Sequence, residues 1–192
     1  MTWSLELSLP DWLEVPTAPF DSELWRSDVG RVFEFLEGID SQLDTSVAAG
    51  GTPLQIGEAI DLLLEFSNAL ADDRQLVAGL TIPGRWPLPV IVSVTATGED
   101  PGDLLEAAGA TGGQAVELPT VEYLPDSLGD GIRVTRFDLD DDGNLWATVS
   151  CARRGGGADT VLTWRTMDLD LVPLFSADLE ELLGCVRIGG DS

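Results

Sequence analysis

The chain has 192 residues, of which 34 are Asp or Glu and 10 are Lys or Arg, and its formal net charge at pH 7 is -24. All ten basic residues are Arg and there is no His, so no imidazole or Lys amine is present as a general base, a metal ligand or a Schiff-base nucleophile. The 44% share of hydrophobic residues is ordinary for a globular chain and predicts a folded core rather than disorder.

Acidic residues are spread along the whole chain, which bears on its partners. A binder of nucleic acid or of an anionic membrane needs clustered cations, and Arg153–Arg154 is the only adjacent basic pair. We therefore expect a protein partner, and a basic one if the acidity is functional. Solubility alone is the alternative explanation of the charge.

The sequence also gives an expectation about location. The first residues carry no basic stretch followed by an apolar one, as a secretory signal would, and no uncharged stretch reaches the ~18 residues of a membrane span. Cys151 and Cys185 both lie in apolar segments, which is typical of buried free thiols. We expect a soluble, cytoplasmic protein.

The first part of the chain predicts a strand followed by two helices. Residues 2–9 alternate apolar and polar side chains, which is the period of a half-buried strand. Apolar residues then recur every three or four positions over residues 22–43, as in an amphipathic helix. A second helix is expected over about 54–70. Its polar positions form one narrow stripe, which predicts burial on two sides.

Beyond residue 73 the hydrophobic period changes to two, which indicates strands. Strands are predicted over residues 75–82, 88–97, 115–118, 132–139, 145–152 and 160–167. A short helix is predicted at 103–108 and a longer helix at 171–183, which a short end at 186–188 follows. The connections at 141–144 and 154–158 have the lengths of antiparallel hairpins. We predict one α+β domain over residues 1–192, an α/β/α sandwich with a central, mainly antiparallel sheet flanked by helices.

One motif has chemical content. Asp138, Asp140 and Asp142, followed by Gly143, match the first half of a calcium-binding loop. The second half fails, because Val149 stands where the bidentate Glu is required and strands rather than helices flank the motif. An Asp-rich hairpin turn is the favoured interpretation, and these three residues are kept as candidate metal ligands.

No catalytic pattern is present. The chain lacks Gly-x-Ser-x-Gly, Cys-x-x-Cys, dinucleotide-binding and zinc-binding patterns. A Ser, Thr or Cys nucleophile would have no imidazole or amine side chain to activate it. Hydrolysis by carboxylates alone is the one enzymatic class that remains open. We therefore expect no enzyme activity and no cofactor.

Several short segments resemble the PsbP-like superfamily, which includes the extrinsic P protein of photosystem II, a Ran-binding nuclear import factor and small actinobacterial proteins. The resemblance is carried by residues 7–16 (Leu-Ser-Leu-Pro-Asp-Trp-Leu-Glu-Val-Pro), by 116–119, by 131–136 and by 162–166 leading into the last helix. It implies an α/β/α sandwich and a function in binding proteins rather than in catalysis. It transfers no catalytic residues to this chain.

These observations favour a non-catalytic, acidic protein-binding module that docks on a basic partner. For an actinobacterial member of such a family, the resemblance points to a secretion-system accessory factor or to an immunity protein that inhibits a toxin. Two alternatives remain. One is a small-ligand or calcium-binding protein that uses Asp138–Asp142, and the other is a carboxylate-only hydrolase.

Overall fold

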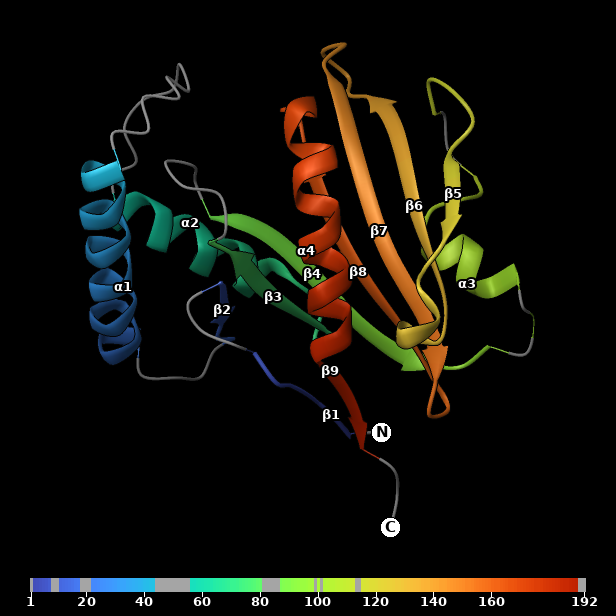
Figure 1. Cartoon of the computed structure of the whole chain (residues 1–192), viewed down its shortest axis with the longest axis horizontal. Helices are drawn as coiled ribbons and strands as arrows, with labels where there is room; N and C mark the ends of the chain where they lie inside the picture. The colour runs from blue at the N-terminus through green and yellow to red at the C-terminus, as the bar shows by residue number, and fades with distance from the viewer. Residues whose placement is uncertain are drawn as a thin grey trace. The chain divides into compact units, whose positions relative to one another are not determined.

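The computed structural model describes residues 2–7, 11–17, 22–43, 56–80, 87–98, 100, 102–112 and 115–189 (Figure 1). Over these residues it confirms an α+β fold whose strands pair mainly antiparallel. The chain divides into two compact units, one of residues 8–89 and one of residues 1–7 with 90–192. The expectation of a single domain stays a prediction.

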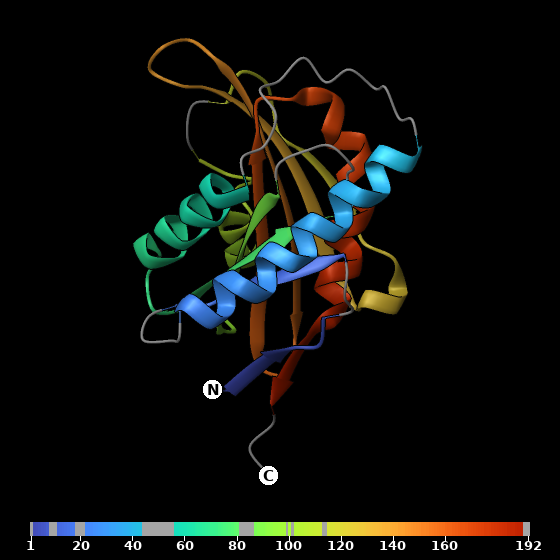
Figure 2. The same cartoon turned by 90° about the vertical axis from the view of Figure 1, so that its left-hand side faces the viewer.

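The unit of residues 8–89 contains a strand pair and two helices. β2 (Trp12–Val15) pairs antiparallel with β3 (Arg74–Gly79), and both strands bury most of their apolar side chains. α1 (Ser22–Leu43) contacts α2 (Ile56–Ala69), and both are visible along their length in Figure 2. α2 is tied to the chain after β2, because the Ser67 hydroxyl donates a hydrogen bond to the carbonyl oxygen of Pro16 at 3.0 Å.

The second unit is built on five antiparallel strands. Their order is β4 (Leu88–Ala96), β8 (Ala158–Thr166), β7 (Leu145–Gly155), β6 (Asp130–Leu139) and β5 (Thr120–Tyr123). The residues of β4 that pair with β8 begin at Val90. A separate two-stranded ribbon joins the ends of the chain, where β1 (Thr2–Leu5) pairs with β9 (Val186–Gly189), as Figures 1 and 2 both show.

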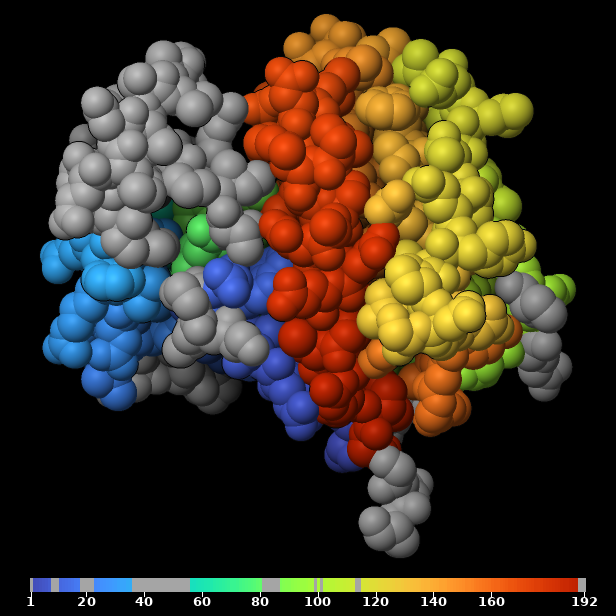
Figure 3. Space-filling view, in the orientation of Figure 1, coloured from blue at the N-terminus to red at the C-terminus, as the bar shows by residue number. Residues whose placement is uncertain are grey.

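Helices cover both faces of this five-stranded sheet. Side chains alternate between the two faces of a strand, so Cys151, Leu162 and Trp164 lie on the same face of the sheet. The helix α4 (Val172–Cys185) packs on this face, and Figure 3 shows α4 as a continuous red band. The rings of Trp164 and Phe175 pack edge to face there, with centroids 4.8 Å apart. On the opposite face, α3 (Gly102–Ala107) packs Leu104 on a cluster that contains Ile132, Val134, Ala152 and Val161. This unit therefore has three layers in the order α, β, α.

Two hairpin turns occur where the sequence predicts them. The turn between β6 and β7 has Gly143 at a φ of 83°, and the turn between β7 and β8 has Gly156 and Gly157 at φ of 60° and 76°. Such positive values favour glycine because it has no Cβ.

The prediction of a strand over residues 115–118 is wrong. Ala115 forms only an isolated bridge with Asp138, and the strand β5 comes later, at Thr120–Tyr123. The register against β6 shifts by two residues between that bridge and β5, so the residues between them cannot continue the same ladder. Alternation shows that a segment can be a strand, but the partner strand decides which residues pair.

Candidate functional site

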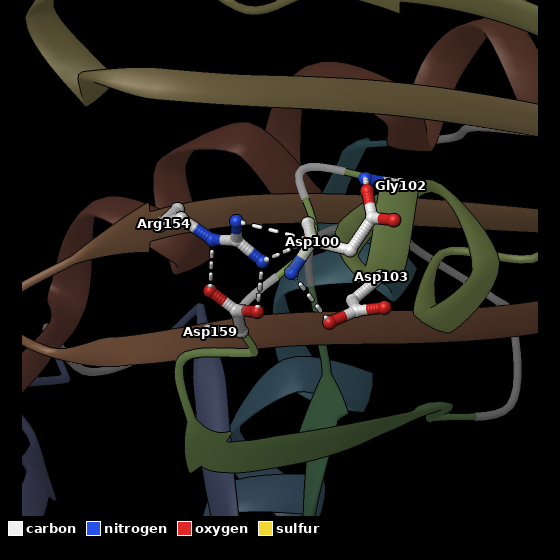
Figure 4. A network of polar contacts seen from close by, with 5 residues as sticks. All are labelled: Asp100, Gly102, Asp103, Arg154 and Asp159. Atoms are coloured by element: carbon white, nitrogen blue, oxygen red, sulfur yellow. Dashed lines mark hydrogen bonds and ion pairs between the residues drawn. The ribbon is translucent and has the colours of Figure 1, made fainter.

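The helix α3 begins with two Asp side chains that cap it reciprocally (Figure 4). Oδ1 of Asp100 accepts the N–H of Gly102 at 2.7 Å, and Oδ2 of Asp103 accepts the N–H of Asp100 at 3.2 Å. This arrangement satisfies main-chain donors at the helix start, as a capping box does. A Cβ at Gly98 would lie 2.0 Å from Oδ2 of Asp103, so the cap requires glycine there. The cap therefore fixes the residue at which α3 begins.

The β7–β8 hairpin contains an ion pair whose Arg also contacts the residue that caps α3. Nε and Nη2 of Arg154 donate to the two carboxylate oxygens of Asp159 at 2.7 Å each, and these residues are direct cross-strand partners. The Asp159 side chain is only 6% exposed. The hydrogen bonds from Arg154 lower the pKa of Asp159, so the pair is ionised at neutral pH. Arg154 also reaches the carbonyl oxygen of Asp100 at 3.4 Å (Figure 4).

β5 is the last strand of the sheet, at the right-hand edge in Figure 1. It pairs with β6 along one side only, with Tyr123 opposite Ile132. Val121 and Tyr123 point to the face that carries α3, where Tyr123 is 88% exposed and Val121 is 42% exposed. A strand edge with exposed apolar side chains is a place where another chain can pair.

A shallow groove lies between β5 and α3, and we refer to it as the β5 groove. Its volume is about 240 Å³, and it is lined by Leu104, Leu105, Val121, Tyr123, Asp130, Ile132 and Arg154. Tyr123 and Asp130 also line a neighbouring hollow of about 370 Å³, together with Asp126 and residues of the following turn. Asp126 and Asp130 are both exposed. The groove thus has apolar walls and an acidic rim.

On the opposite face of the sheet, Arg133 holds β5 in place. Its Nη2 donates to Oε2 of Glu122 on β5 at 2.8 Å, and its Nη1 donates to Oε1 of Glu180 on α4 at 2.5 Å. The two carboxylates raise the pKa of Arg133 against the opposing effect of burial. One side chain therefore connects the edge strand, the next strand and α4. This cross-link gives the short strand β5 a fixed position.

The three candidate metal ligands lie at the other end of β6, and two of them are engaged by other groups. Asp138 accepts hydrogen bonds from Nε and Nη2 of Arg136 at 2.7 to 2.8 Å. Asp140 accepts the main-chain and side-chain N–H groups of Asn144 and the indole N–H of Trp146 at 2.8 to 3.0 Å.

These bonds have an electrostatic consequence. Donors around Asp140, the Trp146 indole foremost, lower its pKa to about 2. Asp142 is exposed in the turn and contributes its main-chain N–H to Asp140 at 3.0 Å. Within the described ranges no three His, Cys, Asp or Glu side chains are placed so that they could hold a metal ion. The contacts are those of an Asp-stabilised hairpin turn, and calcium binding stays an untested alternative.

The thiols are poorly suited to catalysis. Cys151 is fully buried in β7, and burial raises the pKa of its thiol to about 12. Burial likewise raises the pKa of the Cys185 thiol. Both thiols are therefore protonated at neutral pH, and the thiol is a much weaker nucleophile than the thiolate. Neither Cys lines the β5 groove.

Sequence reasoning missed the β5 groove, because its residues come from four separate segments. A signal was nevertheless present. Residues 117–130 hold four acidic residues and no Arg, with Val121 and Tyr123 alternating between Pro119 and Pro125. A short alternating segment between prolines is typical of an edge strand.

Comparison with known proteins leaves the family open. No known protein-family model matches the chain, and a search of curated proteins finds no similar sequence. The PsbP-like resemblance therefore stays a prediction. None of the helices in the described residues is both long enough and apolar enough to cross a membrane.

Proposed function

We propose that this chain is a non-catalytic protein-binding module that docks on a basic partner through the β5 groove. The observation that carries the proposal is the groove itself. Exposed Val121 and Tyr123 form an apolar wall, and acidic residues surround them in a segment without any Arg. An apolar centre with a charged rim is the usual composition of a protein interface.

The pairing of charges supports a basic partner. Arg154, which lines the groove, is already neutralised by its pair with Asp159, and Arg133 on the opposite face of the sheet pairs with two Glu side chains. Asp126 and Asp130 add negative charge at the rim. A positively charged partner would be attracted over a long range, whereas nucleic acid and anionic membranes would be repelled.

In this proposal the protein is cytoplasmic and has no enzymatic activity. A secretion-system accessory factor and a toxin-neutralising immunity protein are the two roles that the PsbP-like resemblance suggests for it. A carboxylate hydrolase is less well supported, because Asp126 and Asp130 are both open to water. A carboxylic acid that protonates a leaving group works best in a less hydrated site.

The test measures association kinetics with a purified partner. The partner is identified by affinity capture from the native host, and its association and dissociation rates are then measured from low to high salt. We expect the association rate to exceed the ~10⁵–10⁶ M⁻¹s⁻¹ of neutral pairs at low salt and to fall steeply as salt rises. We expect the dissociation rate to change far less.

A pair of charge variants tests whether the electrostatic attraction of the partner acts at the β5 groove. Asp126→Asn removes one charge beside the groove, and Asp141→Asn removes one in the exposed β6–β7 turn. The ten residues of β6 separate the two positions by ~30 Å at about 3.4 Å per residue. Asp126→Asn should slow association more than Asp141→Asn does. A salt-independent association rate, or equal effects of the two variants, would contradict the proposal.

A further inference from the structure

The main chain of β5 offers hydrogen-bonding groups on its open edge. The N–H of Leu124 donates to the carbonyl oxygen of Gly131 at 3.0 Å, so these two residues form a hydrogen-bonded pair. Because such pairs alternate along an antiparallel ladder, Glu122 also bonds toward β6, opposite Arg133. The N–H and C=O groups of Val121 and Tyr123 therefore point away from β6.

Two prolines limit the length of this edge. The outward positions fall at every second residue, which are Pro119, Val121, Tyr123 and Pro125. Proline has no main-chain N–H, so only the two central residues can donate to an added strand. The edge can therefore pair with a short segment of about four or five residues, and it cannot support an extended sheet between molecules.

From this geometry we infer that β5 takes up a short extended segment of a basic partner protein as an additional antiparallel or parallel strand. The inference rests on the proposed function and specifies its mode of binding. Alternate side chains of the added strand would lie beside Val121 and Tyr123 over the β5 groove, which favours apolar residues there. The remaining side chains would lie on the opposite face, beside the half-exposed Glu122, which favours Lys or Arg there.

Charge decides between a foreign segment and a second copy of this chain. Each copy carries a formal net charge of -24, and residues 117–130 contain four acidic residues without a basic one. Pairing β5 with β5 would bring like charges together along both strands, which opposes association. A basic segment has the opposite charge and removes this repulsion.

The experiment uses the full chain and synthetic hexapeptides. The peptide pool carries Lys or Arg at three alternate positions and apolar residues at the other three. The peptides are added to the protein up to a peptide concentration of about 1 mM, and binding is followed by NMR. We expect members of the pool to bind and to protect the amides of Val121 and Tyr123 from hydrogen exchange. The same peptides with N-methylated main-chain amides on the pairing edge should bind at least about tenfold more weakly.

A matched pair of variants tests the strand edge in the protein. Val121→Pro removes an outward N–H that pairs with no described residue, and Val121→Ala shortens the same side chain but keeps that N–H. We expect Val121→Pro to weaken binding at least about tenfold more than Val121→Ala does. Circular dichroism checks the fold, and the N-methylated peptides carry the test if the Pro variant does not fold.

Three results would overturn the inference. The first is that no peptide of the pool binds by about 1 mM. The second is binding that is insensitive both to N-methylation and to Val121→Pro, which would refute strand addition. The third is self-association of the free protein that Val121→Pro abolishes, which would assign the edge to a second copy. The first two results leave salt-dependent association with a basic partner intact, so they are distinguishable from failure of the proposed function.

Discussion

Replacing Phe175 by Ala tests how α4 is held on the sheet. Phe175 is fully buried and packs edge to face on Trp164, with ring centroids 4.8 Å apart. Removing a buried Phe side chain costs about 3–5 kcal/mol, because the apolar burial is lost and a cavity remains. The lost aromatic contact adds to this cost, and we expect a value of at least about 4 kcal/mol, the middle of that range. For a chain of this length that corresponds to a fall in Tm of about 8–16 °C.

Differential scanning calorimetry is the appropriate assay, because it resolves separate transitions if the two compact units unfold independently. Leu174→Ala is the matched control, since Leu174 is the preceding residue of the same helix and is 63% exposed. It should change the free energy of unfolding by less than about 0.5 kcal/mol. A loss below about 1 kcal/mol for Phe175→Ala, or equal losses for the two variants, would refute the packing of α4 described above.

Two further predictions concern the β6–β7 turn. Asp140 should titrate near pH 2, as followed by the NMR shift of its carboxyl carbon, because the Trp146 indole and Asn144 stabilise the ionised form. In the folded protein the pKa of Asp140 lies below its ordinary value of 3.8. The ionised carboxylate of Asp140 therefore stabilises the fold fully above about pH 4, and this stabilisation is lost as the pH falls through about 2. A titration midpoint of Asp140 near pH 4 would contradict these contacts. Calcium should leave the Tm unchanged, because Asp138 and Asp140 are already occupied by Arg136, Asn144 and Trp146. A site filled at a hundred times its Kd would add about 2.7 kcal/mol, and such a stabilisation that Asp142→Asn abolished would establish a calcium site instead.

Local sequence patterns were sufficient for most helices and strands. The three- and four-residue spacing predicts the helix at 22–43, and α1 has the same bounds. Gly143 and its neighbouring Asp residues predict a tight turn, and the structure contains it. These features depend on hydrogen bonds and periodicities within a few residues, so the sequence carries their full information.

Apolar composition did not reveal which side chains are covered. The pattern of the second helix predicts burial on two sides, yet Leu62 of α2 is 53% exposed. Tyr123, a large aromatic side chain on β5, is 88% exposed as well. Burial depends on which elements pack against a side chain, and the sequence of one element does not contain that information.

The candidate site depends on tertiary structure for the same reason. The sequence by itself determined the acidity and the absence of imidazole and Lys amine side chains. It thereby excluded a general base, a metal ligand or a Schiff-base nucleophile of those two types. Only the pairing with β6 decided that residues 120–123 rather than 115–118 form the edge strand, and that Val121 and Tyr123 present their main chain outward. The reason is that strand register is a relation between two segments, and a shift of one residue exchanges the faces of every side chain.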